Sequence, residues 1–115
     1  MNPDCIFCKI VAGNIPCDKV YETENILVFK DISPCAPVHL LLIPKKHIPS
    51  LLEITPEDGP IMAELLAIAK HLGETIPELN RNFRLTVSTG PDAGQVIMHV
   101  HFHLIGGRKL NWPPG

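Results

Sequence analysis

The chain has 115 residues, of which 45% are hydrophobic and 19% charged, and its formal net charge is -2. This length is typical of one domain, and the apolar share is sufficient for a core, which excludes a disordered chain. The small negative charge excludes the electrostatic attraction by which basic domains bind nucleic acid or anionic membranes. We therefore predict a single domain over residues 1–115, with neither nucleic acid nor a membrane as its partner.

The sequence carries no basic segment followed by an apolar run, the pattern of a signal peptide, and no apolar stretch long enough to span a bilayer. A cytoplasmic location is the default expectation, and cysteine thiols stay reduced there. The spacing of the four cysteines is therefore interpreted as metal or redox chemistry; they are Cys5, Cys8, Cys17 and Cys35.

The first part of the chain predicts short elements. The whole chain has twelve prolines, and many of them interrupt regular structure. Residues 5–11 predict a short helix or turn that Gly13 ends. Two β-prone runs, residues 20–22 and 26–29, predict a hairpin. The nearly continuous apolar run over residues 38–43 predicts a central strand.

One helix of several turns is predicted between Pro60 and Pro77, the only stretch long enough to hold it. Thr55 begins a helix-start sequence with a capping hydroxyl, followed by a proline and two acidic residues. Apolar residues over positions 61–72 recur at helical spacing, and Gly73 is the expected stop. The pattern predicts an amphipathic helix that packs on a sheet.

Two further strands are predicted over residues 83–88 and 96–105, joined by a glycine-containing turn at residues 90–94. They should pair, and the tail from Trp112 onward should lack regular structure. Hairpins with a single long helix indicate the α+β class. We expect a mostly antiparallel five-stranded sheet with one long helix and a short N-terminal helix.

The strongest functional signal is a row of three histidines at alternate positions, His99, His101 and His103. Alternate side chains of a strand point to the same face, so the three imidazoles should share one face and the apolar residues between them the other. Crowding three titratable groups together costs stability. The row therefore indicates a site.

Three interpretations of the row stay open. A His-x-His pair can bind zinc or iron, usually with a carboxylate, but no acidic residue lies near the row in sequence or on the predicted partner strand. Alternatively, a neutral His101 can attack phosphorus while its neighbours donate to phosphate oxygens. The loop over residues 90–95 would add backbone amides turned inward by its glycines, and Gln95 a side-chain donor. The third interpretation is a packing or pH-sensitive cluster without catalysis.

Residues 99–105, His-Val-His-Phe-His-Leu-Ile, resemble the motif of the histidine triad (HIT) superfamily, His-φ-His-φ-His-φ-φ with φ apolar. Other segments resemble its Hint branch of nucleotide-binding phosphoramidases in the same order along the chain; they are residues 5–10, 31–39, 43–47, 106–108 and 112–115. The match covers essentially the whole chain. The resemblance implies a HIT-like fold and a homodimer that pairs across the helix and a central strand.

The resemblance also implies a hydrolase that cleaves the P–N bond of purine nucleoside 5′-phosphoramidates and releases AMP or GMP without an organic cofactor. His101 would attack the α-phosphorus and form a nucleotidyl-histidine, and His103 would bind the phosphoryl oxygens. His99 and His47 would support the nucleophile or the proton path. Asp31 would accept hydrogen bonds from the ribose hydroxyls. The apolar residues expected to line the base pocket, with core packing as the alternative, are Ile6, Phe7, Ile10, Phe29 and Ile32. The other residues expected beside the substrate are Ser88, Gly94, Gln95 and Trp112.

Two positions depart from the family pattern. Ser88 stands where the family usually has Asn, and Val96 stands where many members have Ser or another polar residue near the phosphate. The Val96 side chain cannot donate a hydrogen bond, and loss of one preorganised donor can lower a rate by roughly a hundredfold. A non-catalytic nucleotide-binding or interaction module is therefore one alternative. A dinucleoside polyphosphate hydrolase, which would use the same nucleophile on a P–O–P bond, is the other.

Cys5 and Cys8 form a Cys-x-x-Cys pair with three interpretations. A thioredoxin-like redox pair would follow a strand, which the residues before Cys5 are too few to form. Two buried thiols without a further role are the second interpretation. Structural zinc is the third, and it needs two more ligands. By resemblance to zinc-binding members of the superfamily, His47 and His99 would complete a four-coordinate site, and His99 would then not serve as a proton donor.

Overall fold

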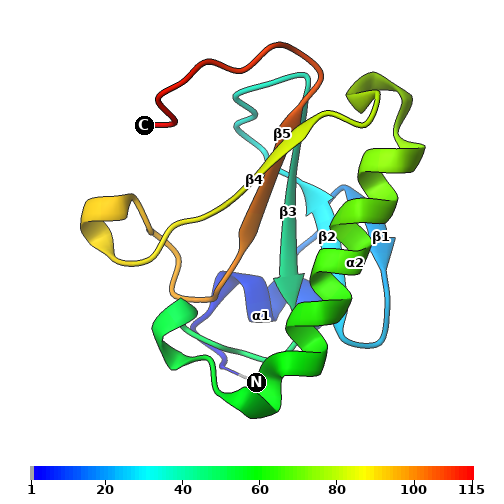
Figure 1. The fold of residues 1–115 in the computed structure, drawn as a ribbon. Helices are drawn as coiled ribbons and strands as arrows, with labels where there is room; N and C mark the ends of the chain where they lie inside the picture. The colour runs from blue at the N-terminus through cyan, green and yellow to red at the C-terminus, as the bar shows by residue number, and fades with distance from the viewer. Residues whose placement is uncertain (1) are drawn as a thin grey trace.

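A five-stranded antiparallel sheet forms the centre of the computed structural model, which describes residues 2–115 (Figure 1). The strands lie in the order β1-β2-β3-β5-β4, and every neighbouring pair is antiparallel. Their bounds are β1 (Lys19–Glu22), β2 (Ile26–Lys30), β3 (Val38–Pro44), β4 (Phe83–Val87) and β5 (Phe102–Gly106). With α1 (Ile6–Val11) and α2 (Gly59–Thr75), they confirm the expected α+β fold.

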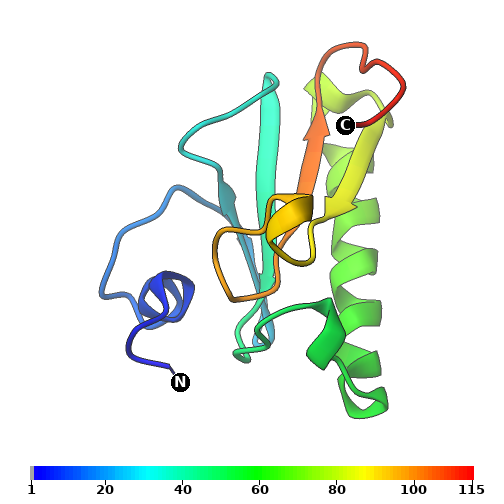
Figure 2. The same cartoon turned by 90° about the vertical axis from the view of Figure 1, so that its left-hand side faces the viewer.

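The two helices lie on opposite faces of the sheet, as Figure 2 shows. The larger core cluster packs α2 against the sheet through Leu65, Ile68 and Leu72. The smaller cluster packs α1 against the other face through Phe7, which lies against Phe29 of β2. Every residue of the central strand β3 is buried, because it contributes side chains to both clusters. The continuous apolar run of β3 is typical of a strand covered on both faces. No helix within residues 2–115 is long and apolar enough to cross a membrane.

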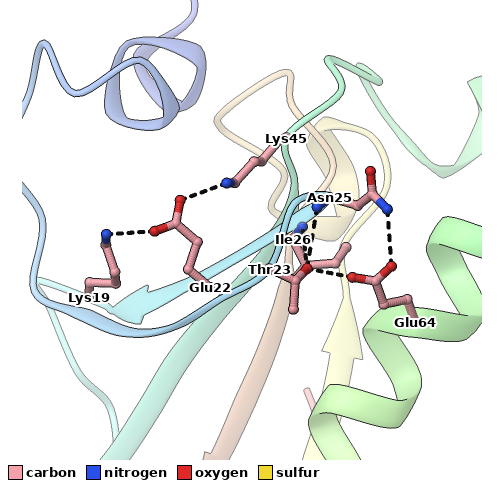
Figure 3. A network of polar contacts seen from close by, with 7 residues as sticks. All are labelled: Lys19, Glu22, Thr23, Asn25, Ile26, Lys45 and Glu64. Atoms are coloured by element: carbon pink, nitrogen blue, oxygen red, sulfur yellow. Dashed lines mark hydrogen bonds and ion pairs between the residues drawn. The ribbon is translucent and has the colours of Figure 1, made fainter.

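Polar contacts fasten the tip of the first hairpin to α2 (Figure 3). The Glu64 carboxylate accepts from the Asn25 side-chain amide at 3.1 Å and from the Thr23 hydroxyl. The Thr23 hydroxyl in turn accepts from the Ile26 N–H at 3.0 Å, where β2 begins. These donors hold the pKa of Glu64 below its usual range, with the Thr23 hydroxyl as the largest cause. The hairpin and the helix are thus joined outside the apolar core.

The long helix begins close to the expected point but does not stop at Gly73. Thr55 and Asp58 form a capping box ahead of α2, and the helix runs on to Thr75. Gly73 is buried inside the helix because the Phe83 ring of β4 lies against it, and a Cβ atom there would collide with that ring. Gly73 is therefore a packing position for β4, and the expectation that it ends the helix is wrong.

The histidine strand is shorter than expected, because β5 begins only at Phe102. The last residue pairs of the ladder join Phe102 to Leu42 of β3 and to Val87 of β4. His103 therefore lies in the strand, whereas His99 and His101 precede it in an irregular segment. The predicted pairing of the last two strands is confirmed, but residues 96–101 belong to the connecting loop.

Candidate functional site

The three histidines line one side of the molecule even though only His103 lies in a strand. The Phe7 ring on α1 meets the His101 ring edge to face at a centroid distance of 5.1 Å and the His99 ring at 5.8 Å. The His101 and His103 rings follow at 5.2 Å. Val100, between them, is 1% exposed. His99 and His101 therefore face α1. The imidazoles lie on one face although two of them are outside the hydrogen-bonded strand ladder.

Hydrogen bonds fix the tautomer of His101. Its Nδ1 lies 2.8 Å from the backbone carbonyl of His99, and because a carbonyl only accepts, this Nδ1 carries the proton and donates. The Nε2 of a neutral His101 therefore carries the free lone pair. The side chain is half-buried. This is the protonation pattern that a nucleophilic imidazole needs.

A fourth histidine, His39 on β3, sets the tautomer of His103. The backbone N–H of Cys35 donates to His39 Nδ1 at 3.1 Å, so the proton of a neutral His39 is on Nε2. That Nε2 lies 2.8 Å from His103 Nδ1 and donates to it. The proton of a neutral His103 is then on its Nε2, which leaves a donor directed away from His39. No role of His39 is predicted from the sequence, although the residue lies in one of the segments that resemble the family.

Burial lowers the pKa of His103 below its ordinary value, and the neighbouring His101 and His39 lower it further. Asp31 acts in the opposite direction but more weakly. Its Oδ2 lies 3.4 Å from His39 Nε2, and its Oδ1 accepts from the Ser33 N–H at 2.8 Å. No acidic residue lies near the row in sequence or on β4, but the fold brings the Asp31 carboxylate, at the end of β2, to the row through His39.

Cys5, Cys8, His47 and His99 form a second cluster, which we call the Cys/His cluster; one ligand atom from each lies within 4.8 Å of the others. His99 Nδ1 lies 3.4 Å from Cys5 Sγ and 3.6 Å from Cys8 Sγ. His47 Nδ1 lies 3.3 Å from Cys8 Sγ and 3.2 Å from His99 Nδ1. A tetrahedral zinc with bonds of about 2.3 Å to sulfur and about 2.0 Å to nitrogen requires ligand atoms roughly 3.3–3.8 Å apart. The four side chains therefore fit such an ion.

The protonation of His99 also suits a metal ligand. Its Nε2 lies 2.8 Å from the Pro44 carbonyl and must donate to it, so Nδ1, which faces the cluster, carries the lone pair. Burial is the main reason that the pKa of His99 is lowered, which favours the neutral ring. A backbone carbonyl that orients a ligating imidazole is the usual outer partner of a metal site. Burial also raises the pKa of the Cys5 thiol.

The loop after β4 differs from the expectation in the use of Gln95. Its side-chain nitrogen donates to the carbonyls of Pro49 and Ile97, and its oxygen accepts from the Gly90 N–H at 3.0 Å. Gln95 therefore braces the loop and is not a free phosphate donor. The amides of Ala93, Gly94 and Gln95 also bond within the loop.

The first backbone amide beyond the braced turn is that of Val96. Within residues 2–115 its N–H has no hydrogen-bond partner, and its side chain is 88% exposed. Val96 lies two residues after Gly94, whose φ of 92° is a left-handed conformation that favours glycine. After the turn, the backbone N–H of Val96 is therefore a free hydrogen-bond donor, although the Val96 side chain is not a donor. Ser88 is half-buried and directly follows β4.

The residues expected to line a base pocket divide into two groups. Phe7 and Phe29 are buried in the core and pack on each other, whereas Ile6 is 44% and Ile32 99% exposed. Ile10 is only partly covered, against the smaller core. Ile6 also lines a groove of about 470 Å³ together with His47, Val96 and Met98. Trp112, in the irregular tail, is 80% exposed. The two aromatic residues are therefore core residues, whereas Ile6 and Ile32 are exposed and Ile10 is partly covered.

Comparisons with known proteins agree with this arrangement. Residues 12–110 match the HIT domain family. An uncharacterized HIT-like protein of Synechocystis is 45% identical over 115 residues, which cover all of both chains. A HIT family hydrolase from Legionella pneumophila superposes with a TM-score of 0.94 at 44% identity, covering 97% of this chain and 100% of the other. A histidine triad nucleotide-binding protein from Candida albicans superposes with a TM-score of 0.80 at 34% identity, covering 97% of this chain and 85% of the other. The chain therefore belongs to the HIT domain family.

Proposed function

We propose that the protein hydrolyses the P–N bond of purine nucleoside 5′-phosphoramidates and releases the nucleoside monophosphate. The observation that carries the proposal is the 2.8 Å hydrogen bond from His101 Nδ1 to the His99 carbonyl, which leaves the Nε2 lone pair for attack on phosphorus. The description of the Legionella relative as a hydrolase supports the reaction type. That of the Candida relative as nucleotide-binding supports the substrate class.

The reaction proceeds in two displacements at phosphorus. His101 Nε2 attacks the α-phosphorus, a P–N(His) bond forms, and the substrate P–N bond breaks; the amine leaves with a proton taken up from water. Water then attacks the same phosphorus, the bond to His101 breaks, and a proton returns to solvent. The sum is one phosphoramidate and one water converted to one nucleoside monophosphate and one amine.

His103 and its neighbours stabilise the charge on the phosphoryl group. The His103 Nε2–H, set by the donation from His39, donates to a phosphoryl oxygen, and preorganised donors of this kind are a large part of catalysis at phosphorus. The free N–H of Val96 is a second donor at the end of the braced turn. Asp31 holds lone pairs beyond the one that accepts from the Ser33 N–H, and these accept from the ribose hydroxyls.

The base lies against the face of α1. Ile6 and Ile10 present apolar surface at the margin of the buried Phe7 and Phe29 rings, and flat apolar surface suits a purine. Ile32, almost wholly exposed, is available for apolar contact with the base.

Structural zinc in the Cys/His cluster is a second part of the proposal. The distances between the cluster atoms match the edges of a zinc tetrahedron, and the free lone pair of His99 Nδ1 faces the cluster. Four protein ligands leave no open position on the ion, so it supplies stability and no chemistry at the substrate. One zinc per chain in native mass spectrometry would support this assignment.

We also propose a homodimer. β4 is one of the two edge strands of the sheet, and Phe83 on it and Leu66 on α2 are 38% and 53% exposed. An edge strand with apolar neighbours is protected when a second chain covers it. Light scattering coupled to size-exclusion chromatography should give twice the chain mass, and a monomer at all concentrations would contradict the proposal.

The test of the reaction is an intact-mass experiment. The protein is mixed with an adenosine phosphoramidate and quenched with acid-free denaturant; we expect a mass increase of one nucleotidyl group in the parent and none in His101→Ala. A parallel reaction with a diadenosine polyphosphate distinguishes a phosphoramidase from a dinucleoside polyphosphate hydrolase. Faster AMP release from that substrate, or AMP binding without any turnover or adduct, would overturn the phosphoramidase assignment.

A further inference from the structure

The segment that carries the nucleophile is held by few backbone contacts of the sheet. The ladder ends at Phe102, so His101 lies just outside it. A backbone hydrogen bond of 2.6 Å joins the Val100 N–H of this segment to the Ile48 carbonyl. Strand pairing therefore leaves the His101 imidazole to be oriented by other contacts, of which the His99 carbonyl is the closest.

His99 connects the Cys/His cluster to His101, because its ring belongs to the cluster and its backbone carbonyl contacts His101. The ring of His99 is held at both nitrogens, by Cys5 and Cys8 at Nδ1 and by the Pro44 carbonyl at Nε2. The backbone carbonyl of the same residue accepts from His101 Nδ1. The ring contacts therefore restrain the residue whose carbonyl determines which nitrogen of His101 is free.

Helix α1 is a second connection between the Cys/His cluster and His101. Cys5 caps that helix, since its Sγ accepts from the Cys8 N–H at 3.4 Å, and Cys8 lies in the first turn. Phe7 stands between the two cysteines and packs edge to face on both His101 and His99. A helix of six residues is too short to be stable alone, so its position depends on these contacts.

We propose that the Cys/His cluster, closed by zinc, is the positioning centre of the nucleophile: it holds the His99 carbonyl and the Phe7 ring so that His101 keeps one tautomer and one orientation. Cys5, Cys8 and His47 are then positioning residues, since they act through His99 and α1 and do not touch the substrate. The inference rests on the proposed reaction and on the proposed zinc, and it adds that loss of the ion acts on His101 itself.

The experiment compares the zinc-loaded protein with protein stripped by a chelator, and with Cys8→Ser. Three readings are made: the ¹⁵N shifts of the His101 ring, amide hydrogen exchange, and kcat with AMP affinity. We expect a single Nδ1–H tautomer of His101 only in the loaded protein, and faster exchange at residues 6–11 and 99–101 in the other two. kcat should fall about 10–100-fold, the size typical of lost outer-shell order, with a smaller change in AMP affinity.

A matched variant separates positioning from general damage. Cys17→Ser changes a thiol outside the Cys/His cluster and should leave all readings unchanged. Where Cys8→Ser fails to fold, the stripped parent supplies the same comparison.

A stripped protein that keeps the single His101 tautomer and its kcat would overturn the inference, as would a parent that binds no zinc. A parent that shows no turnover but changes its tautomer and exchange on zinc removal would contradict the proposed reaction and uphold the positioning role.

Discussion

His39 Nε2 and His103 Nδ1 lie 2.8 Å apart although the two residues do not face each other in the ladder. The register of β3 and β5 pairs His39 with Ile105 and Leu41 with His103. The two histidines are therefore diagonal neighbours on the same face of the sheet, a distance that long side chains can bridge. The contact links 64 residues of sequence separation and fixes the donor of His103.

Replacement of His39 should test this donor. In His39→Leu no proton is donated to His103 Nδ1, so His103 populates both tautomers and the phosphoryl donor is partly lost. We expect kcat for an adenosine phosphoramidate to fall about 100-fold, within the range for a positioned proton donor. His39→Gln keeps an N–H of similar reach and should lose less.

The ¹⁵N shifts of the His103 ring in the two variants give an independent reading. A His39→Leu protein with unchanged kcat and an unchanged His103 tautomer would show that the 2.8 Å contact has no part in catalysis.

Much of the fold could be predicted because its signals are local. The apolar run of β3, the spacing along α2 and the hairpin pattern each depend on neighbouring residues, and all three elements are confirmed. The bounds that were wrong depend on contacts between distant segments. Gly73 continues the helix because Phe83 packs on it, and the histidine segment leaves the ladder before Phe102.

The site divides in the same way. The alternation of the triad identified the histidine row, because its three members are near each other in sequence. His39 and the nearby carboxylate of Asp31 come to the row only through the β3–β5 register. The role of Gln95 could not be predicted either, since its acceptors on Pro49 and Ile97 become neighbours only when the loop folds back.

Val96→Ser should increase turnover of the phosphoramidate. The position is 88% exposed, so the change should leave the free energy of unfolding nearly unaltered. A hydroxyl would add a side-chain donor next to the free backbone N–H, and we expect kcat to rise about tenfold, less than the effect of removing an optimised donor. Val96→Ala is the matched control, because it removes the methyl groups without adding a hydroxyl. Equal rates in the two variants would show that bulk, not hydrogen bonding, limits the reaction.

The stability of the metal-free protein should fall as the pH decreases below 6.5. The pKa of His103 lies below its ordinary value of 6.5 in the folded state, mainly because of burial, with His101 and His39 adding to the effect and Asp31 opposing it. Below pH 6.5 the unfolded chain therefore binds a proton that the folded chain excludes, until the folded pKa is reached. The pKa of His99 is lowered as well and acts in the same direction.

Urea unfolding between pH 7 and pH 5 measures this dependence. His103→Gln should show a shallower loss of unfolding free energy than the parent over this interval, and the remaining slope should reflect His99. An identical slope in parent and variant would indicate that His103 titrates normally in the folded protein.

Gln95→Ala should destabilise the protein by about 1–3 kcal/mol. The side chain is 7% exposed, and its removal leaves the carbonyls of Pro49 and Ile97 and the Gly90 N–H without their partner. Gln95→Glu keeps the acceptor for Gly90 but sets a carboxylate against two carbonyls, so it should be at least as destabilising. Unfolding free energies from urea titration decide, and a loss below about 0.5 kcal/mol in both variants would mean that water replaces the brace.

Two glycines of α2 should respond in opposite directions to replacement by alanine. At Gly59 an added Cβ meets no atom within 4 Å, so Gly59→Ala should raise the unfolding free energy by up to about 1 kcal/mol through helix propensity and a less flexible unfolded chain. At Gly73 the same Cβ would lie 2.8 Å from Phe83 Cδ2. Overpacking costs about 1–3 kcal/mol and exceeds the gain in propensity, so Gly73→Ala should be destabilising.

Urea unfolding at matched protein concentration removes any contribution of dimerisation from the comparison. A Gly73→Ala protein as stable as Gly59→Ala would mean that the Phe83 ring, 38% exposed at the sheet edge, moves aside at no cost. The contact between Phe83 and Gly73 would then have no influence on where α2 ends.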